Sequence, residues 1–523
     1  MIDVTTLSAY DLSQKLHSGE ISSLDLCKAY LDRIKKFEKD VQAWQFLDKK
    51  LLLEKAEEAD TYRKSGKPLG PLHGMPVAIK DIIGTYDMPT ECGTVFRKKM
   101  SNSQDSEIVN LLKNSGAIIM GKTVTCELAY IHPSKTKNPH DYSRTPGGSS
   151  SGSAAAVAAH MAPLSVGSQT GGSVIRPASY CGVVGYKPSY GLISRNGVLK
   201  VSDKLDTMGV FGKSVKDVAL LAKSLIRKDL HDPSTIYFAA DNMIQECEKG
   251  PVFDPKFIFY KTKNWKNINK KSQQAFEFLI KNFKKNIEVF DTPSYFDEIP
   301  KYHQIIHEVD MANNFQVYYK KDKTKLSKEM REAISRGLKY SAKEYCDASD
   351  FIKQSYESYK EVFEDYHGII TPSYFDDIPK YHQIIHEVDM ANNFQVYYKK
   401  DKTKLSKEMR EAISRGLKYS ATEYGDAADF MKQRYESYKE VFEDYHGIIT
   451  PSSSGVADKG LKSTGSADFQ KIWTYLGLPT ISLPLLTGEN DLPLGVQLIG
   501  DRLDDLRFLG TANWLEKNCR DEG

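Results

Sequence analysis

The sequence predicts an α/β protein, because short apolar runs alternate with helical patterns between Gly70 and about residue 222. Such alternation is typical of domains in which helices cover a β-sheet. The composition agrees, since 40% of the residues are hydrophobic and 72 basic residues nearly balance 69 acidic ones. A chain of 523 residues is long enough to bury a large core. The runs and patterns are PVAIK at 76–80, GAIIMGK at 116–122, SAAAVAAHM at 153–161 and PLSVGS at 163–168.

The N-terminal segment is predicted to form helices that cover the sheet. Ser22 and Asp25 have the spacing of a helix N-cap and its partner. Leu24, Cys27 and Leu31 then recur at helical intervals.

A near-identical repeat follows further along the chain. Residues 292–370, the first copy, are matched by residues 371–449, the second copy, at 73 of 79 positions. This identity is too close for an ancient repeat protein and indicates a recent duplication or an assembly error. Removing 79 of the 523 residues would leave 444, a length typical of the family named below, so one copy is interpreted as surplus. The differing pairs are Glu298/Asp377, Lys343/Thr422, Cys346/Gly425, Ser349/Ala428, Ile352/Met431 and Ser355/Arg434.

Each copy is predicted to be mainly helical. In the first copy Leu326, Met330, Ile334 and Leu338 fall four residues apart, as on one helix face. Each copy ends in an apolar strand, and only the later one, at 447–450, leads directly into the C-terminal region. We therefore expect that later strand in the main sheet.

The charge and the cysteines of the chain indicate its class of partner and its cellular location. A formal net charge of +3 is too small for a nucleic-acid-binding surface. Seven scattered cysteines without a CxxC pair favour a reduced, cytoplasmic location. The N-terminal residues lack the basic and apolar regions of a signal peptide, and no long uncharged apolar run follows. We expect neither export nor membrane insertion.

The most informative stretch covers residues 145–191. Two glycine-serine turns lie in it, GGSSSGS at 147–153 and TGGS at 170–173. A flexible linker would not stand between a strand pattern and an Ala-rich helical run. Two such turns bring small side chains and free backbone N–H groups together, as the binding of an anionic transition state requires. The stretch therefore predicts a catalytic site.

Five segments together resemble the amidase signature family. They are GPLHGMPVAIKD, GGSSSGS, GSQTGGSVIRPASYCGVVGYKPSYG, GLPTISLP at 477–484 and LPLGVQLIG at 492–500. The resemblance implies one large domain over 1–523, with a mixed central β-sheet covered by helices on both faces. Within it we expect a catalytic signature core at 70–222, the two repeat copies at 292–370 and 371–449, and a C-terminal part of the core at 450–515.

The resemblance also implies an amidase with a Ser-Ser-Lys triad. By motif, Ser173 is the nucleophile, Ser149 is the bridging serine with a cis peptide bond, and Lys80 is the base. A serine hydroxyl needs a group that removes its proton, and a neutral lysine can do so. Burial must then lower the pKa of Lys80, since desolvation disfavours the ammonium form. The product would be an acyl-enzyme that releases ammonia or an amine.

The backbone N–H groups of Thr170, Gly171, Gly172 and Ser173 are expected to form the oxyanion hole. The resemblance implies neither a metal nor an organic cofactor. The expected partner is a small-molecule amide substrate, and the resemblance leaves a homodimer open.

Two residues depart from the common family pattern. Gln169 replaces an aspartate, and Arg176 in SVIRP is shifted by one place. This variant resembles malonamidase-like, stand-alone amidases, in which such an arginine pairs with a substrate carboxylate. We hypothesise a small polar amide as substrate. The alternative, that Arg176 ties down its loop through backbone carbonyls, is equally consistent with the sequence.

Two other functions are retained as alternatives. The glutaminase component of a tRNA-dependent amidotransferase shares these motifs, although CELAY at 126–130 and Gln169 weigh against it. An inactive interaction protein with this fold is the alternative of another class. His73, His132 and His140 are interpreted as structural or loop residues, and Cys181 as a small packed residue.

Overall fold

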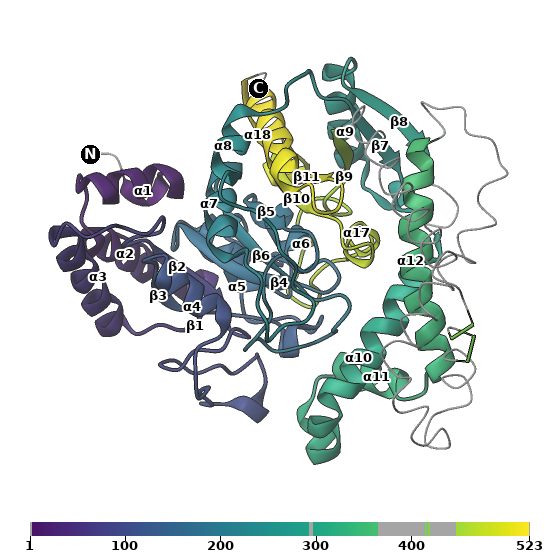
Figure 1. Ribbon diagram of the computed structural model, residues 1–523, viewed down its shortest axis with the longest axis horizontal. Helices are drawn as coiled ribbons and strands as arrows, with labels where there is room; N and C mark the ends of the chain where they lie inside the picture. The colour runs from purple at the N-terminus through teal and green to yellow at the C-terminus, as the bar shows by residue number, and fades with distance from the viewer. Residues whose placement is uncertain (1–2, 292–296, 365–413, 416, 419–445, 522–523) are drawn as a thin grey trace. The chain divides into compact units, whose positions relative to one another are not determined.

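An 11-stranded mixed β-sheet is the framework on which helices pack (Figure 1). The computed structural model describes residues 3–291, 297–364, 414–415, 417–418 and 446–521. The sheet lies in a unit formed by Met1–Tyr356 and His446–Gly523. Its strands are β1 (Trp44–Phe46), β2 (Pro76–Lys80), β3 (Ile118–Thr123), β4 (Leu164–Gln169), β5 (Val184–Lys187), β6 (Thr207–Gly212), β7 (Phe257–Lys261), β8 (Ile287–Asp291), β9 (Gly447–Pro451), β10 (Thr480–Thr487) and β11 (Pro493–Ile499).

The strand order is β1-β3-β2-β4-β6-β5-β10-β11-β9-β7-β8. β2 pairs in parallel with both β3 and β4, and β7 pairs in parallel with β8 and β9. The remaining pairs are antiparallel. Parallel neighbours end at the same edge of a sheet, so the last residue of β2 lies beside the end of β4.

The α-helices among the described residues are α1 (Ala9–Ser18), α2 (Ser23–Val41), α3 (Lys49–Lys64), α4 (Glu107–Asn114), α5 (Ser151–Ala158), α6 (Ile175–Cys181), α7 (Val215–Leu225), α8 (Met243–Lys249), α9 (Lys270–Asn282), α10 (Ile299–Asp322), α11 (Lys328–Gly337), α12 (Ala342–Glu364), α17 (Lys471–Tyr475) and α18 (Asp505–Asp521). The predicted N-terminal helix is confirmed. Ser22 is the N-cap of α2, and its side chain accepts a hydrogen bond from the backbone N–H of Asp25.

Helices cover both faces of the sheet. Successive side chains of a strand point to opposite faces, so odd and even positions of β6 have different neighbours. A Cβ at Gly209 would lie 2.8 Å from Val174, which precedes α6, whereas a Cβ at Gly212 would lie 2.5 Å from Asp217 of α7. α6 and α7 therefore lie on opposite faces, as the resemblance implied.

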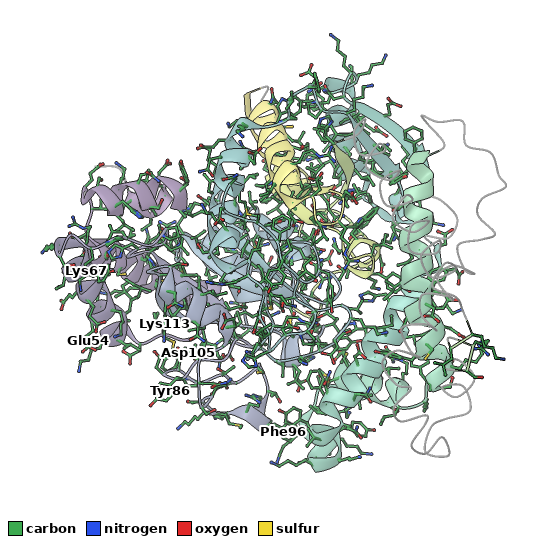
Figure 2. All side chains as sticks on the ribbon, viewed as in Figure 1. Glu54, Lys67, Tyr86, Phe96, Asp105 and Lys113 are labelled. Carbon is green, nitrogen blue, oxygen red and sulfur yellow. The ribbon has the colours of Figure 1, made fainter. Side chains whose placement is uncertain are left out.

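The described part of the first repeat copy is helical, as predicted. α10, α11 and α12 all lie within it. Of the predicted apolar face, Leu326, Met330 and Ile334 are buried. Leu338, the residue directly after α11, is 52% exposed, so the buried face ends at Ile334 and the prediction is wrong for Leu338. Phe96 (Figure 2) stacks on Tyr318 of α10 with ring centroids 5.3 Å apart.

The second copy lies outside the described residues apart from 414–415, 417–418 and 446–449, so its predicted helices stay a prediction. Its final strand, β9, pairs with β11 and β7, which confirms the expectation that residues 447–450 join the main sheet. Among the described residues, no helix is long and apolar enough to cross a membrane.

Candidate active site

Lys80 is the last residue of β2, and its side chain is fully buried. Its amine nitrogen, Nζ, donates to the hydroxyl oxygens of Ser149 at 2.8 Å and Ser168 at 3.0 Å. Burial lowers the pKa of Lys80 to about 7, and nearby Cys126 and Asp206 oppose that shift only in part. A substantial fraction of this amine is therefore neutral near pH 7.

Ser149 lies in a packed turn that leads into α5. The peptide bond between Gly148 and Ser149 is cis. A Cβ at Gly148 would come within 2.7 Å of Cys126 Sγ, and Ser151 donates to the carbonyl oxygen of Gly147. The GGSSSGS segment is therefore part of the core and does not act as a linker.

Residues 170–173, which we call the glycine loop, connect β4 to α6. Among the residues that the structure describes, none accepts a hydrogen bond from the four backbone N–H groups of this loop. Gln169 precedes the loop, and its Oε1 accepts from the N–H groups of Val174 and Ile175. Its Nε2 donates to Thr474 Oγ1 at 2.9 Å. Gln169 therefore caps the start of α6, and the N–H groups of the glycine loop, which precedes this helix, stay available for a ligand.

The glycine loop is also fixed from other elements. Thr170 Oγ1 donates to Asp206 at 2.7 Å, and the Thr170 carbonyl oxygen lies 2.8 Å from His303 Nε2. Thr474 Oγ1 donates to the carbonyl oxygen of Gly171 at 2.8 Å. A Cβ at Gly172 would lie 2.6 Å from Gln470 Oε1, so only glycine fits at that position without displacement.

A cavity of about 320 Å³ opens beside Ser173. The Ser173 hydroxyl has no hydrogen-bond partner among the described residues. Five residues of the first repeat copy contribute to the wall, so this segment forms part of the site. The wall includes the glycine loop, Tyr130, Arg176, His303, His307 and Arg336.

Arg176 is buried at this wall. Its Nη2 donates to the carbonyl oxygen of Gly148 at 2.6 Å and to Thr464 Oγ1 at 3.5 Å. Its Nε is buried and has no partner among the described residues. Arg176 thus ties down the loop before Ser149 and also borders the cavity, so both sequence interpretations stay open.

The residues that were interpreted as structural make structural contacts. His73 Nε2 lies 3.1 Å from the carbonyl oxygen of Ala59, and His140 Nε2 lies 2.9 Å from that of Cys181. His132 Nδ1 lies 3.0 Å from Glu329 Oε2 of α11. The buried Cys181 Sγ donates to the carbonyl oxygen of Pro146.

Sequence reasoning missed three residues of the site: Ser168, Asp206 and His303. Ser168 stands directly before Gln169 in a strand pattern that ends at the glycine loop, so its position was a usable signal. Nothing in the sequence connects Asp206 or His303 to that loop. In the part of the chain that the structure describes, no cluster of three or more His, Cys, Asp or Glu side chains could hold a metal ion.

Comparisons with known proteins place these observations in context. The family model described as Amidase matches residues 25–400. The chain is 29% identical over 532 residues to the A subunit of glutamyl-tRNA(Gln) amidotransferase from Alkaliphilus metalliredigens, with 98% of this chain and 96% of that protein covered.

Two solved structures are similar over nearly the whole chain. The A subunit of glutamyl-tRNA(Gln) amidotransferase from Thermotoga maritima has a TM-score of 0.65 at 26% identity, and the match covers 99% of this chain and 96% of that one. A crystal structure of an amidase has a TM-score of 0.71 at 23% identity, and the match covers 98% of this chain and 100% of that one. The second likeness shows a shared fold.

Proposed function

The chain belongs to the Amidase family, and from this premise we propose that it hydrolyses the carbon–nitrogen bond of a small polar amide through Ser173, Ser149 and Lys80. Its 11-stranded sheet and covering helices form the α/β amidase signature fold. The observation that carries the proposal is the 2.8 Å contact between Lys80 Nζ and Ser149 Oγ, at a lysine whose pKa is about 7.

The first step is the attack of Ser173 on the amide carbonyl. Ser149 accepts the proton of Ser173 and passes its own proton to the neutral Lys80 amine, so the nucleophile is activated without a histidine. The Oγ–carbon bond forms and the carbonyl oxygen becomes an oxyanion. The backbone N–H groups of the glycine loop donate to that oxyanion, and one good donor of this kind typically contributes about 2.7 to 4 kcal/mol.

The second half of the reaction reverses the proton path. The carbon–nitrogen bond breaks as Lys80, through Ser149, returns a proton to the leaving nitrogen, and ammonia or an amine departs. Water then attacks the acyl-enzyme, gives its proton to the same pair of residues, and releases the carboxylic acid and Ser173. The two serines and the lysine end in their starting protonation states.

The cavity supports a small substrate. Its volume of about 320 Å³ is near the lower end of the range of about 300–1,000 Å³ for small-molecule sites. Two wall cations already have partners, because Arg336 pairs with Glu308 and Lys471 pairs with Asp468. The position of the Arg176 guanidinium in the cavity wall supports a substrate that carries an acceptor such as a carboxylate or ureido oxygen.

Ammonia release from a panel of small amides, acidic amides, ureas and glutamine tests the proposal. Ser173→Ala and Lys80→Ala should abolish release while the protein stays folded. Lys187→Met is the matched control, because Lys187 is equally buried with a pKa of about 7 but donates to the carbonyl oxygens of Pro188 and Leu478. Release that survives Ser173→Ala would rule out the proposed nucleophile.

Arg176→Ala separates its two roles. A substrate contact predicts that KM rises for acidic amides and changes little for neutral ones. A structural role predicts an equal fall in kcat for every amide, because the Gly148 carbonyl loses its hydrogen-bond partner whichever amide is bound. If KM for every acidic amide stayed unchanged, the carboxylate hypothesis would be abandoned.

A second candidate is the glutaminase function of an amidotransferase component. The similarity to the A subunit of glutamyl-tRNA(Gln) amidotransferase over 98% of this chain favours it. That function predicts that glutamine turnover depends on partner proteins and tRNA. If the isolated chain instead hydrolyses glutamine at a rate that partner proteins and tRNA do not change, that result would favour a stand-alone amidase. An inactive interaction protein predicts no release from any amide in the panel.

A further inference from the structure

Thr170, the first residue of the glycine loop, is held at both of its polar ends. Its hydroxyl donates to Asp206 Oδ1 at 2.7 Å, and its carbonyl oxygen lies 2.8 Å from His303 Nε2. The first partner belongs to the core, whereas His303 comes from α10 in the first repeat copy, 133 residues away. The N–H groups of Gly171, Gly172 and Ser173, which line the cavity and have no acceptor among the described residues, follow directly after this carbonyl.

The His303 ring also lies against the next residue. A Cβ added to Gly171 would stand 3.5 Å from His303 Cε1 and 3.7 Å from Nε2. His303 is only 2% exposed, and burial lowers its pKa to about 4, so the ring is neutral near pH 7. A neutral imidazole that bonds a carbonyl oxygen through Nε2 must carry its proton there. His303 is therefore a fixed donor to the loop.

The helix that carries His303 is anchored to the same region a second time. Asp206 Oδ2 accepts from the backbone N–H of Ser202 at 3.0 Å, and Ser202 Oγ donates to Asp310. Asp310 lies on α10, two helical turns beyond His303, and also accepts from Tyr345 of α12 at 2.7 Å. Two connections to Thr170, one direct and one through Asp206, set the distance between α10 and the glycine loop.

We infer that His303 is a positioning residue that orients the oxyanion-binding N–H groups by donating to the Thr170 carbonyl oxygen. This inference rests on the proposed function of the glycine loop. A displacement of about 1 Å in a reacting geometry can lower a rate about 100-fold. Loss of the His303 donor is therefore expected to lower the chemical rate about 10- to 100-fold and to change KM little.

The test uses a fluorophosphonate probe, which reports on the nucleophile without a known substrate. Ser173 Oγ forms a bond to phosphorus, the phosphorus–fluorine bond breaks, fluoride leaves, and the serine proton passes through Ser149 to Lys80. The phosphoryl oxygen occupies the oxyanion site, so the labelling rate depends on the orientation of the loop. Ser173→Ala gives the background.

Three variants of the full-length chain separate positioning from packing. His303→Phe keeps a ring but has no donor, whereas His303→Gln restores a neutral N–H near the position of Nε2. His382→Phe changes the same residue in the second copy and is the matched control. His303→Met replaces the phenylalanine variant if that protein does not fold, as judged by thermal melting.

The expected result is a labelling rate about 10- to 100-fold lower in His303→Phe, largely recovered in His303→Gln and unchanged in His382→Phe. Equal losses of labelling rate in the phenylalanine and glutamine variants, or no loss in either, would overturn this inference and leave the proposed function standing. An equal loss in His382→Phe would overturn the assignment to His303. A wild-type protein that is not labelled at Ser173 would overturn the proposed function and this inference with it.

Discussion

The amine nitrogen of Lys80 lies 2.8 Å from the hydroxyl oxygen of Ser149, at a site where burial lowers the pKa of the lysine to about 7. The contact joins the end of β2 to the turn before α5, which are 69 residues apart in the chain. If this amine is the base, its protonation controls the reaction.

The pH dependence of turnover follows from that pKa. The protonated amine cannot accept a proton, so kcat/KM should rise with pH through about 7 and fall about tenfold for each pH unit below it. Initial rates between about pH 5 and 9 measure this limb. A flat profile, or a limb near the ordinary lysine pKa of about 10.4, would contradict a buried neutral base.

Ser168→Ala removes one of the two hydrogen-bond partners of the Lys80 amine. The ammonium form loses more than the neutral form, so the acid limb should shift to lower pH, and kcat should fall about tenfold because the amine is less well oriented. The pH profile of the variant measures both. Ser165→Ala is the control, since that buried hydroxyl on the same strand donates to the Ser153 carbonyl and should leave the profile unchanged.

Gln169→Ala removes the acceptor of two backbone N–H groups at the start of α6. Buried donors without an acceptor typically destabilise a protein by about 1–3 kcal/mol each, so the loss of both bonds should lower the free energy of unfolding by about 2–6 kcal/mol. Urea denaturation measures it. Gln45→Ala, at an exposed position, should stay within about 0.5 kcal/mol of wild type. Equal stability of the two variants would show that the cap contributes nothing.

Deletion of either repeat copy tests whether one is surplus. Without residues 371–449, Gly368, Ile369 and Ile370 would precede Thr450 and Pro451 and reproduce the GIITP sequence of β9. Both shortened chains have 444 residues and differ from each other at six positions. Each should melt cooperatively and release ammonia at the wild-type rate. If neither shortened protein folded, both copies would be needed, and the interpretation of one copy as surplus would be wrong.

Part of this site could be predicted because its residues stand in distinctive local patterns. PVAIK predicts a buried strand that ends at Lys80, and the two glycine-serine turns predict close backbone approach around Ser149 and Ser173. The structure brings Lys80 and Ser149 into hydrogen-bond contact and places Ser173 in the wall of the cavity. Here local pattern and tertiary position agree.

Other contacts depend on strand pairing and helix docking, which no local pattern encodes. Ser168 meets Lys80, 88 residues earlier, because β2 and β4 pair in parallel with Ile79 beside Val166. His303 reaches Thr170 because α10 lies on the glycine loop. A single histidine on an ordinary helical segment gives no signal of a partner 133 residues away.

One wall of the cavity is encoded twice in this chain. His303, Glu308 and Arg336 recur unchanged as His382, Glu387 and Arg415, while five of the six differences between the copies lie between positions 343 and 355 of the first copy or their counterparts. If a single copy serves the site, natural selection acts on that copy alone, and the other can drift. Codons for this wall in related natural isolates should then accumulate changes in one copy and remain fixed in the other.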